Sequence, residues 1–219
     1  EILRHHSSDF PRLCSYQRFV QLQSRCVMPL FFYLLTKLGS CTGISFIDAT
    51  PLKVCHNLRI PSHRVFRGSA ERDKSSTGWY YGFKLHLAIN EKGEILGFYL
   101  TSANVDERET VDWITQDLWG KLIGDKGYIS KSLFEKLMQR GLKLITKLRK
   151  NMKNRFVEME DKLLLRKRAI IETVNDQLKN ISNIEHSRHR SLWNFLGNLA
   201  SGLIAYCWME KKPSLNLNF

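Results

Sequence analysis

The stretch Ser45-Phe46-Ile47-Asp48-Ala49-Thr50 decides the fold, because it predicts an apolar β-strand that ends in an acid. It follows Gly43, and Pro51 is predicted to close the strand, so Asp48 lies near the end of a central strand. A carboxylate at that place either accepts hydrogen bonds from the following loop or belongs to a functional site. Two later acids favour the functional site.

A second strand that runs into an acid lies at residues 121–128, where Lys121-Leu122-Ile123-Gly124 precedes Asp125. We predict a helix over residues 130–140 and a further short strand over residues 142–148. Alternation of strand, helix and strand favours parallel pairing. Asp48 and Asp125 are 77 residues apart, so they become neighbours only if their strands are adjacent and parallel.

The middle of the chain predicts antiparallel strands. Apolar and polar residues alternate over residues 79–89, which predicts a long strand with one apolar face, and a turn at 90–93 leads to a partner strand over 95–101. The basic insert at residues 53–78 is predicted to be a loop that faces solvent or DNA. A helix over 106–117 follows, and we interpret three acids of its first turn as partners of the helix dipole: Asp106, Glu107 and Glu109.

A helix is predicted over residues 161–181. At about 100° per residue, Arg168, Glu172 and Lys179 share one stripe of this helix. The stripe is either a surface salt bridge between residues four apart or part of a functional site, with Glu172 as a third acid. An apolar row on another side of the helix would pack on the sheet: Leu163, Ile170, Val174 and Ile181.

Helices are also predicted near both ends of the chain. Residues 13–38 have near-helical apolar spacing, with Pro29 as a break between two helical pieces. Residues 191–209 predict a helix that packs over the sheet and could contact a second copy of the chain.

The composition favours a polyanionic partner, because 34 Lys and Arg stand against 21 Asp and Glu, a formal charge of +13. Residues 143–168 hold ten basic residues and three acids, which makes them the predicted phosphate contact. No apolar stretch reaches the roughly 20 residues that a membrane span needs, so we expect no membrane partner. Five cysteines without a C-x-x-C pair suggest buried, reduced thiols, and with no signal peptide we expect a cytoplasmic protein associated with the nucleoid.

Two strand-end aspartates and a helical glutamate in a basic α/β chain suit two divalent cations held against a phosphodiester. Carboxylates are the ligands that Mg²⁺ prefers.

Three passages resemble the DDE transposases of bacterial insertion sequences. They are Ser45-Phe46-Ile47-Asp48, Gly124-Asp125-Lys126-Gly127-Tyr128, and Arg168-x3-Glu172-x6-Lys179. The last passage resembles the Tyr-x2-Arg-x3-Glu-x6-Lys signature of one large group of these enzymes. Leu165 replaces its tyrosine, so the role that the family gives that tyrosine does not carry over.

The resemblance implies an α/β, ribonuclease H-like mixed sheet, with three antiparallel strands and then parallel strands, flanked by helices. It implies a helical N-terminal segment at residues 1–43, a catalytic domain at 44–210 and a tail at 211–219. The implied enzyme cuts DNA at element ends and transfers the 3′-hydroxyl into target DNA, as a homodimer.

The implied metal ligands and catalytic residues are Asp48, Asp125 and Glu172, which would hold two ions of Mg²⁺ or Mn²⁺. The DNA-binding residues predicted from the signature and the basic stretch are Arg168, Lys179, Lys126, Arg149, Lys150, Lys153 and Arg155.

Two alternatives stay open. A structure-specific nuclease with the same core would cut without joining, and a transposon-derived DNA-binding protein would do neither. All three acids are present, which argues against the second alternative.

Overall fold

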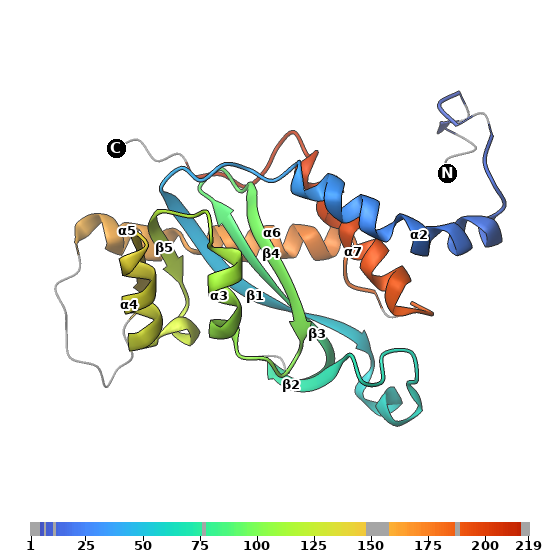
Figure 1. Cartoon of the computed structure of the whole chain (residues 1–219), viewed down its shortest axis with the longest axis horizontal. Helices are drawn as coiled ribbons and strands as arrows, with labels where there is room; N and C mark the ends of the chain where they lie inside the picture. The colour runs from blue at the N-terminus through green and yellow to red at the C-terminus, as the bar shows by residue number, and fades with distance from the viewer. Residues whose placement is uncertain are drawn as a thin grey trace.

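The computed structural model describes residues 5–6, 8–10, 12–75, 78–147, 158–186 and 189–215. A mixed six-stranded sheet lies at the centre, with α6 behind it and α3 in front in the view of Figure 1, while α2 and α7 lie side by side at one end. None of the described helices combines the length and the apolar character that crossing a membrane requires.

The sheet has the order β2-β3-β1-β5-β6, with β4 also paired to β3. Strand β3 is antiparallel to its three partners, whereas β5 is parallel to β1 and to β6. This arrangement confirms the predicted mixed sheet. The strands are β1 Ile44–Cys55, β2 Glu71–Ser75, β3 Gly78–Asn90, β4 Ile95–Ser102, β5 Gly120–Gly124 and β6 Leu142–Thr146.

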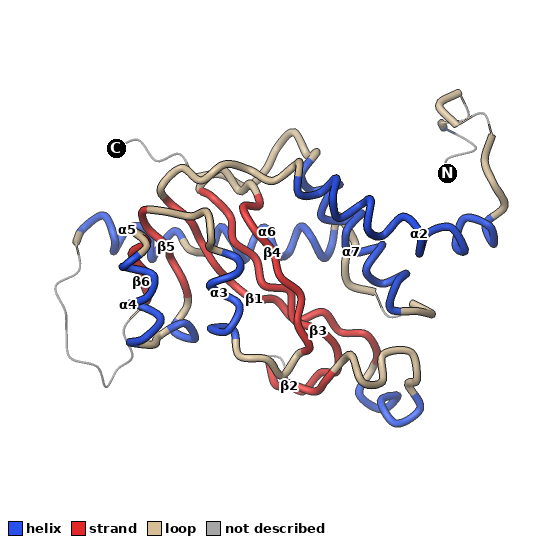
Figure 2. Tube along the Cα trace, in the orientation of Figure 1, coloured by secondary structure: helices blue, strands red, loops and turns tan. Residues whose placement is uncertain are grey.

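The helices lie on both faces of this sheet (Figure 2). Side-chain hydroxyls of Ser15, Ser130 and Ser191 cap the first turns of α2, α4 and α7, each accepting a hydrogen bond from a backbone N–H three residues on. The helices are α2 Tyr16–Leu35, α3 Glu107–Ile114, α4 Lys131–Gln139, α5 Met159–Lys167, α6 Ala169–Asn180 and α7 Leu192–Cys207, with short 3₁₀ turns η1 Asn57–Ser62 and η2 Lys126–Tyr128.

Alternation along the strands builds two cores, because successive side chains point to opposite faces. Phe46 joins the larger core under α6 and α7, whereas its neighbour Ile47 joins the smaller core under α3 and α4. The predicted C-terminal packing helix is confirmed as α7, whose Phe195, Leu199 and Leu203 are buried in the larger core.

The predicted apolar face of β3 is confirmed, because Tyr81, Phe83, Leu85, Leu87 and Ile89 all join the larger core. The opposite face is largely buried as well, with the polar side chains of His86 and Asn90, and α3 packs against it at Ala88.

The sequence predicts that β1 ends at Pro51, but the strand continues to Cys55. Pairing with β5 is seen only over Ile44–Phe46, so the later part of β1 has β3 on one side and an open edge on the other. The carbonyl of Pro51 accepts a hydrogen bond from the Lys179 side chain instead of from a strand. Proline is tolerated there because its missing N–H would have faced the open edge.

The basic insert at residues 53–78, predicted as a loop, contains η1 and β2. Strand β2 pairs with the first part of β3, over Gly78–Gly82, and β4 pairs with the rest. The sequence of β2, Glu-Arg-Asp-Lys-Ser, has no apolar alternation, because none of its side chains is buried. Backbone pairing with β3 therefore forms this strand, and a hydrophobic pattern could not predict it.

Two helix predictions need correction. Helix α2 continues through Pro29, because its packing on α7 and the burial of Val27 and Leu34 outweigh the lost hydrogen bond. The helix predicted over 161–181 is divided at Arg168 into α5 and α6.

The break at Arg168 changes which side chains of this region are buried. Ile170 and Val174 of the predicted apolar row are buried, whereas Leu163 and Ile181 are exposed. Buried positions in α5 and α6 outside the predicted row include Leu164, Ile171 and Leu178.

The cysteines are all free but none is buried, contrary to expectation. Cys14 and Cys26 are exposed, and Cys41, Cys55 and Cys207 are partly buried.

Candidate active site

The parallel register of β1 and β5 relates Asp48, which lies in the middle of β1 and not at its predicted end, to Asp125, which follows β5. Ile44, Ser45 and Phe46 pair with Lys121, Leu122 and Ile123, each pair being 77 residues apart. The same offset separates Asp48 from Asp125. The pairing itself ends at Phe46 and Ile123, two residues before each aspartate. The predicted adjacent and parallel strands are therefore confirmed.

Asp48 lies on the α6 face of β1 and is largely buried, with 21% of its side chain exposed. Arg168 Nη1 lies 3.5 Å from Asp48 Oδ1, and Asn175 Nδ2 donates a hydrogen bond of 3.2 Å to Asp48 Oδ2. Burial raises the pKa of Asp48 to about 7, against the lowering effect of Arg168, and the charges of Glu107 and Glu172 raise it further. The site therefore disfavours the ionised carboxylate of Asp48, which a bound cation would stabilise.

Arg168 and Glu172 form the ion pair between residues four apart that their spacing predicts as the alternative to a functional stripe. Arg168 Nη2 forms an ion pair and a hydrogen bond with Glu172 Oε1. The break between α5 and α6 places Arg168 inward, with 16% of its side chain exposed, so that it lies between Asp48 and Glu172. Glu172 itself is 56% exposed and faces solvent at the border of the site.

Lys179 has a different environment from the one its DNA-binding prediction suggests. Its Nζ donates a 2.5 Å hydrogen bond to the carbonyl of Pro51 and lies 3.1 Å from Glu185 Oε2. Glu185 Oε1 in turn accepts a 2.8 Å hydrogen bond from the backbone N–H of Lys53. Lys179 and Glu185 therefore cover the open edge of β1, next to Asp48.

The turn after β5 presents Asp125 and Lys126 on the surface and buries Tyr128 completely. Gly124 makes this turn compact, because an added Cβ would lie 3.1 Å from the Tyr128 ring and 3.3 Å from Ile47. The Tyr128 hydroxyl has no hydrogen-bond partner among the described residues.

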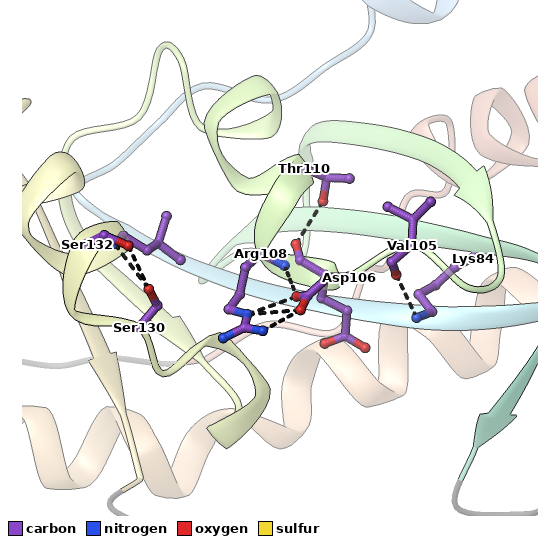
Figure 3. A network of polar contacts seen from close by, with 9 residues as sticks. Lys84, Val105, Asp106, Arg108, Thr110, Ser130 and Ser132 are labelled. Atoms are coloured by element: carbon purple, nitrogen blue, oxygen red, sulfur yellow. Dashed lines mark hydrogen bonds and ion pairs between the residues drawn. The ribbon is translucent and has the colours of Figure 1, made fainter.

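The first turn of α3 packs against η2. Asp106 caps the helix by accepting a 2.9 Å hydrogen bond from the backbone N–H of Arg108, whose side chain also pairs with it (Figure 3). The Arg108 hydrogen bond lowers the pKa of Asp106 to about 2. The same view shows Lys84 donating to the carbonyl of Val105. The interpretation of Asp106 as a partner of the helix terminus agrees with this geometry.

Glu107, the next acid, has a different environment from Asp106. It is half-buried, and its charge raises the pKa of Asp48. The pattern of an acid in a first helical turn gave no signal that distinguished Glu107 from its neighbours.

The predicted phosphate-contacting stretch is only partly described. Arg149, Lys150, Lys153 and Arg155 lie outside the described residues. At the start of the stretch, Lys143 Nζ lies 2.8 Å from Asp161 Oδ2, and Lys121 of β5 lies 2.9 Å from Asp161 Oδ1. Lys143 therefore joins α5 to the sheet, because it neutralises a buried aspartate.

The carboxylates suit a divalent cation by their oxygen donors and by the raised pKa of Asp48. In the part of the chain that the structure describes, no group of three His, Cys, Asp or Glu side chains lies close enough together to hold a metal ion. The meeting of Asp48, Asp125 and Glu172 around a metal therefore stays a prediction.

A family model, the transposase DDE domain, matches residues 38–192, more than half of the chain. The chain belongs to this family, whose members depend in general on divalent metal ions. The match includes Asp48, Asp125, Arg168 and Glu172. No curated protein sequence matches the chain.

Three solved structures are similar to the chain at 8% identity. The piggyBac transposase synaptic complex with hairpin DNA has a TM-score of 0.48, covering 80% of this chain and 50% of that chain. The Mos1 strand transfer complex has a TM-score of 0.29 with coverages of 90% and 61%, and the catalytic domain of Mos1 mariner transposase has 0.26 with 90% and 93%. This chain thus spans half the length of the piggyBac chain, and likeness at these values supports no statement about activity.

Proposed function

We propose that this chain is the catalytic part of a DDE transposase of a bacterial insertion sequence. It would cut DNA at the ends of the element and join the freed 3′-hydroxyl to target DNA. The observation that carries the proposal is the parallel pairing of β1 with β5 at an offset of 77 residues, the separation of Asp48 and Asp125, in a chain of the transposase DDE domain family. The proposed catalytic domain spans residues 44–210, with a helical segment at 1–43 and a tail at 211–219.

Asp48, Asp125 and Glu172 would hold two ions of Mg²⁺ or Mn²⁺. Such a pair of ions, about 4 Å apart, activates the attacking oxygen and stabilises the leaving oxygen of a phosphodiester. Arg168 already contacts Asp48 and Glu172, so it is positioned to move between these carboxylates and a nearby DNA phosphate.

DNA is the proposed partner because the chain has a formal charge of +13. Lys126, next to Asp125 on the surface turn, is the described residue best placed for a phosphate near the scissile bond. The proposed contacts at Arg149, Lys150, Lys153 and Arg155 predict that each alanine variant lowers the salt slope of DNA binding by about one unit if its side chain touches a phosphate.

The test is a cleavage and strand-transfer assay with the whole chain, Mg²⁺ and the inverted repeats that flank its gene. The parent should cut the repeats and join them to a supercoiled target. D48N, D125N and E172Q should lose both steps and keep DNA affinity, whereas D117N, at an exposed acid before β5, should keep both. Robust cleavage by a site variant would exclude that residue from the metal site.

The same assay separates the alternatives. Cleavage without joining would identify a nuclease, and DNA binding by a parent that never cuts would identify a DNA-binding protein without catalysis.

A homodimer is the proposed active assembly. Several large apolar side chains of α2 and both ends of α7 are exposed, as a subunit contact requires. They include Phe19, Phe32, Trp193 and Trp208. Light scattering of the chain with and without repeat DNA would measure the assembly, and a monomer in both conditions would contradict it.

A further inference from the structure

A cavity of about 350 Å³ lies where η1 packs against β3, beside β2 at the outer edge of the sheet. Figure 1 shows η1, in teal, beside β2 at the end of the molecule away from α4 and α5. The volume is near the lower limit of about 300 Å³ for ligand pockets, so the cavity suits one small group. Its walls are mostly apolar and come from six residues: Asn57, Leu58, Ile60, Arg72, Trp79 and Tyr80.

Contacts within this part of the chain hold the walls of the cavity in place. Asn57 Nδ2 donates a 2.7 Å hydrogen bond to the carbonyl of Trp79, which ties η1 to the start of β3. Ile60 packs against the larger core, and Tyr80 is buried. The cavity is therefore formed before a ligand binds, so that binding requires little ordering of the chain.

Trp79 presents a large aromatic ring at this cavity, since 63% of the residue is exposed. In the antiparallel pairing Trp79 lies opposite Lys74, and Arg72 lies two residues before Lys74 on the same face of β2. Both basic side chains are exposed, and neither forms an ion pair or a hydrogen bond with a residue that the structure describes. An exposed indole beside two unpaired cations matches a ligand that combines a planar ring with a negative charge.

The insert around the cavity is strongly basic, because residues 53–78 contain six basic residues and two acidic ones. One of the acids, Asp73, already lies 3.1 Å from the Nζ of Lys84. The six basic side chains are all exposed, and none forms an ion pair within the described ranges: Lys53, Arg59, Arg64, Arg67, Arg72 and Lys74. This uncompensated charge favours a polyanion over an apolar protein segment as the occupant of the cavity.

We propose that the cavity binds an unpaired base of DNA, stacked on Trp79, while Arg72 and Lys74 hold the adjacent phosphates. An aromatic side chain can accept any base in this way, because every base has a π-face. Asn57 Oδ1 has no partner among the described residues, so it can accept a hydrogen bond from an amino group of the base. The inference rests on the proposed function, to which it adds a contact with one base of the DNA partner.

The cavity is separate from the candidate active site. Asp48 pairs with Leu87, and Trp79 lies eight residues before Leu87 on the same strand. At a rise of about 3.4 Å per residue, this separation along β3 is about 27 Å, or about eight base pairs of DNA. Binding at the cavity can therefore be measured in chelator, without the metal site.

The test is fluorescence anisotropy of the whole chain in chelator with three labelled duplexes, which carry at one position an unpaired base, an abasic site in its place, or a complementary pair. Stacking of one base changes affinity by about 5- to 150-fold, so the parent should prefer the unpaired base to the abasic site by a factor in this range. W79A should lose this preference and keep the parental affinity for the paired duplex. Trp113 is 64% exposed and lies on α3, outside the cavity, so the control W113A should keep both. Added salt should weaken the binding of all three duplexes and preserve the preference, because stacking is not an ionic contact.

Parental preference in W79A, or a parent that binds the paired duplex and shows no preference, would overturn this inference and leave the proposed function standing. A parent that binds none of the three duplexes would overturn both. A dimer that dissociates in W79A while the base preference stays unchanged would make the cavity a contact between copies of the chain, against the inference.

A second variant keeps the test decisive if W79A melts lower than the parent. Leu58 lines the cavity and is 85% exposed, so L58E should fold as the parent does. Its carboxylate would repel the phosphate of a base bound in the cavity, so L58E should lose the preference for the unpaired base. Parental preference in L58E would contradict the inference.

Discussion

Asp48→Asn should stabilise the protein in chelator, although it changes a largely buried residue of a central strand. The pKa of Asp48 is about 7 in the folded protein against 3.8 ordinarily. One pKa unit corresponds to about 1.4 kcal/mol, so ionised Asp48 lowers the free energy of unfolding by at most about 4 kcal/mol. For a chain of this length the ceiling is a melting temperature higher by about 8 to 16 °C in the variant.

The raised pKa of Asp48 makes the stability of the parent depend on pH. Because the folded-state pKa is raised, the parent is relieved of this cost below about pH 4 and loses stability as the pH rises toward 7. Asparagine resembles the neutral carboxyl and can still accept the hydrogen bond from Asn175. The advantage of D48N should therefore be absent at pH 4 and largest at pH 8.

The assay is thermal unfolding in chelator between pH 4 and pH 8, followed by addition of Mg²⁺ at neutral pH. D117N removes an equal charge from an exposed loop and should not change the melting temperature. D48N should also gain less from Mg²⁺ than the parent, for which saturation at 100 times the dissociation constant adds about 2.7 kcal/mol. If D48N is less stable than the parent at pH 8 and gains as much from Mg²⁺, Asp48 is a hydrogen-bond acceptor of the strand.

Three further outcomes are expected from the contacts around the sheet. K179M should lower the free energy of unfolding by about 1 to 3 kcal/mol in urea titrations, because Glu185 and the Pro51 carbonyl lose their partner, whereas K162M, at an exposed position, should not. A K179M protein with parental stability but a lower salt slope of DNA binding would return Lys179 to the DNA interface. Tyr206 donates a 2.7 Å hydrogen bond to the carbonyl of Gly93, so Y206F should lower the free energy of unfolding by about 1 kcal/mol in the same titrations. An equal decrease in Y99F, whose ring is exposed, would refute this account. Burial lowers the pKa of His86 to about 4, so the contribution of His86 to stability is present above pH 6.5 and is lost as the pH falls toward 4. In the D48N background, H86Q should therefore reduce the loss of stability between pH 6.5 and pH 4. An unchanged loss over this range would show that His86 does not titrate there.

The sequence by itself determined the frame of the candidate site. An apolar run before an acid predicts a buried strand, and two such runs with a helix and strand after the second predict parallel pairing, although β1 continues past Asp48 to Cys55. The 77-residue separation of Asp48 and Asp125 is the register offset that the structure shows. The spacing of four residues also predicts the contact of Arg168 with Glu172, although Arg168 lies at the break before α6 and not inside one continuous helix.

Only the tertiary structure decided which polar groups surround that frame. β2 forms because β3 offers it a free edge, and Lys179 contacts Pro51 because β5 leaves part of β1 unpaired. Glu107 and Asp106 are adjacent acids in one helical turn, yet Asp106 caps α3 while Glu107 faces the turn after β5. These differences depend on which surfaces α3, η2 and β1 present to one another. Hydrophobic periodicity records only how each element meets the core, so it contains no information about such contacts.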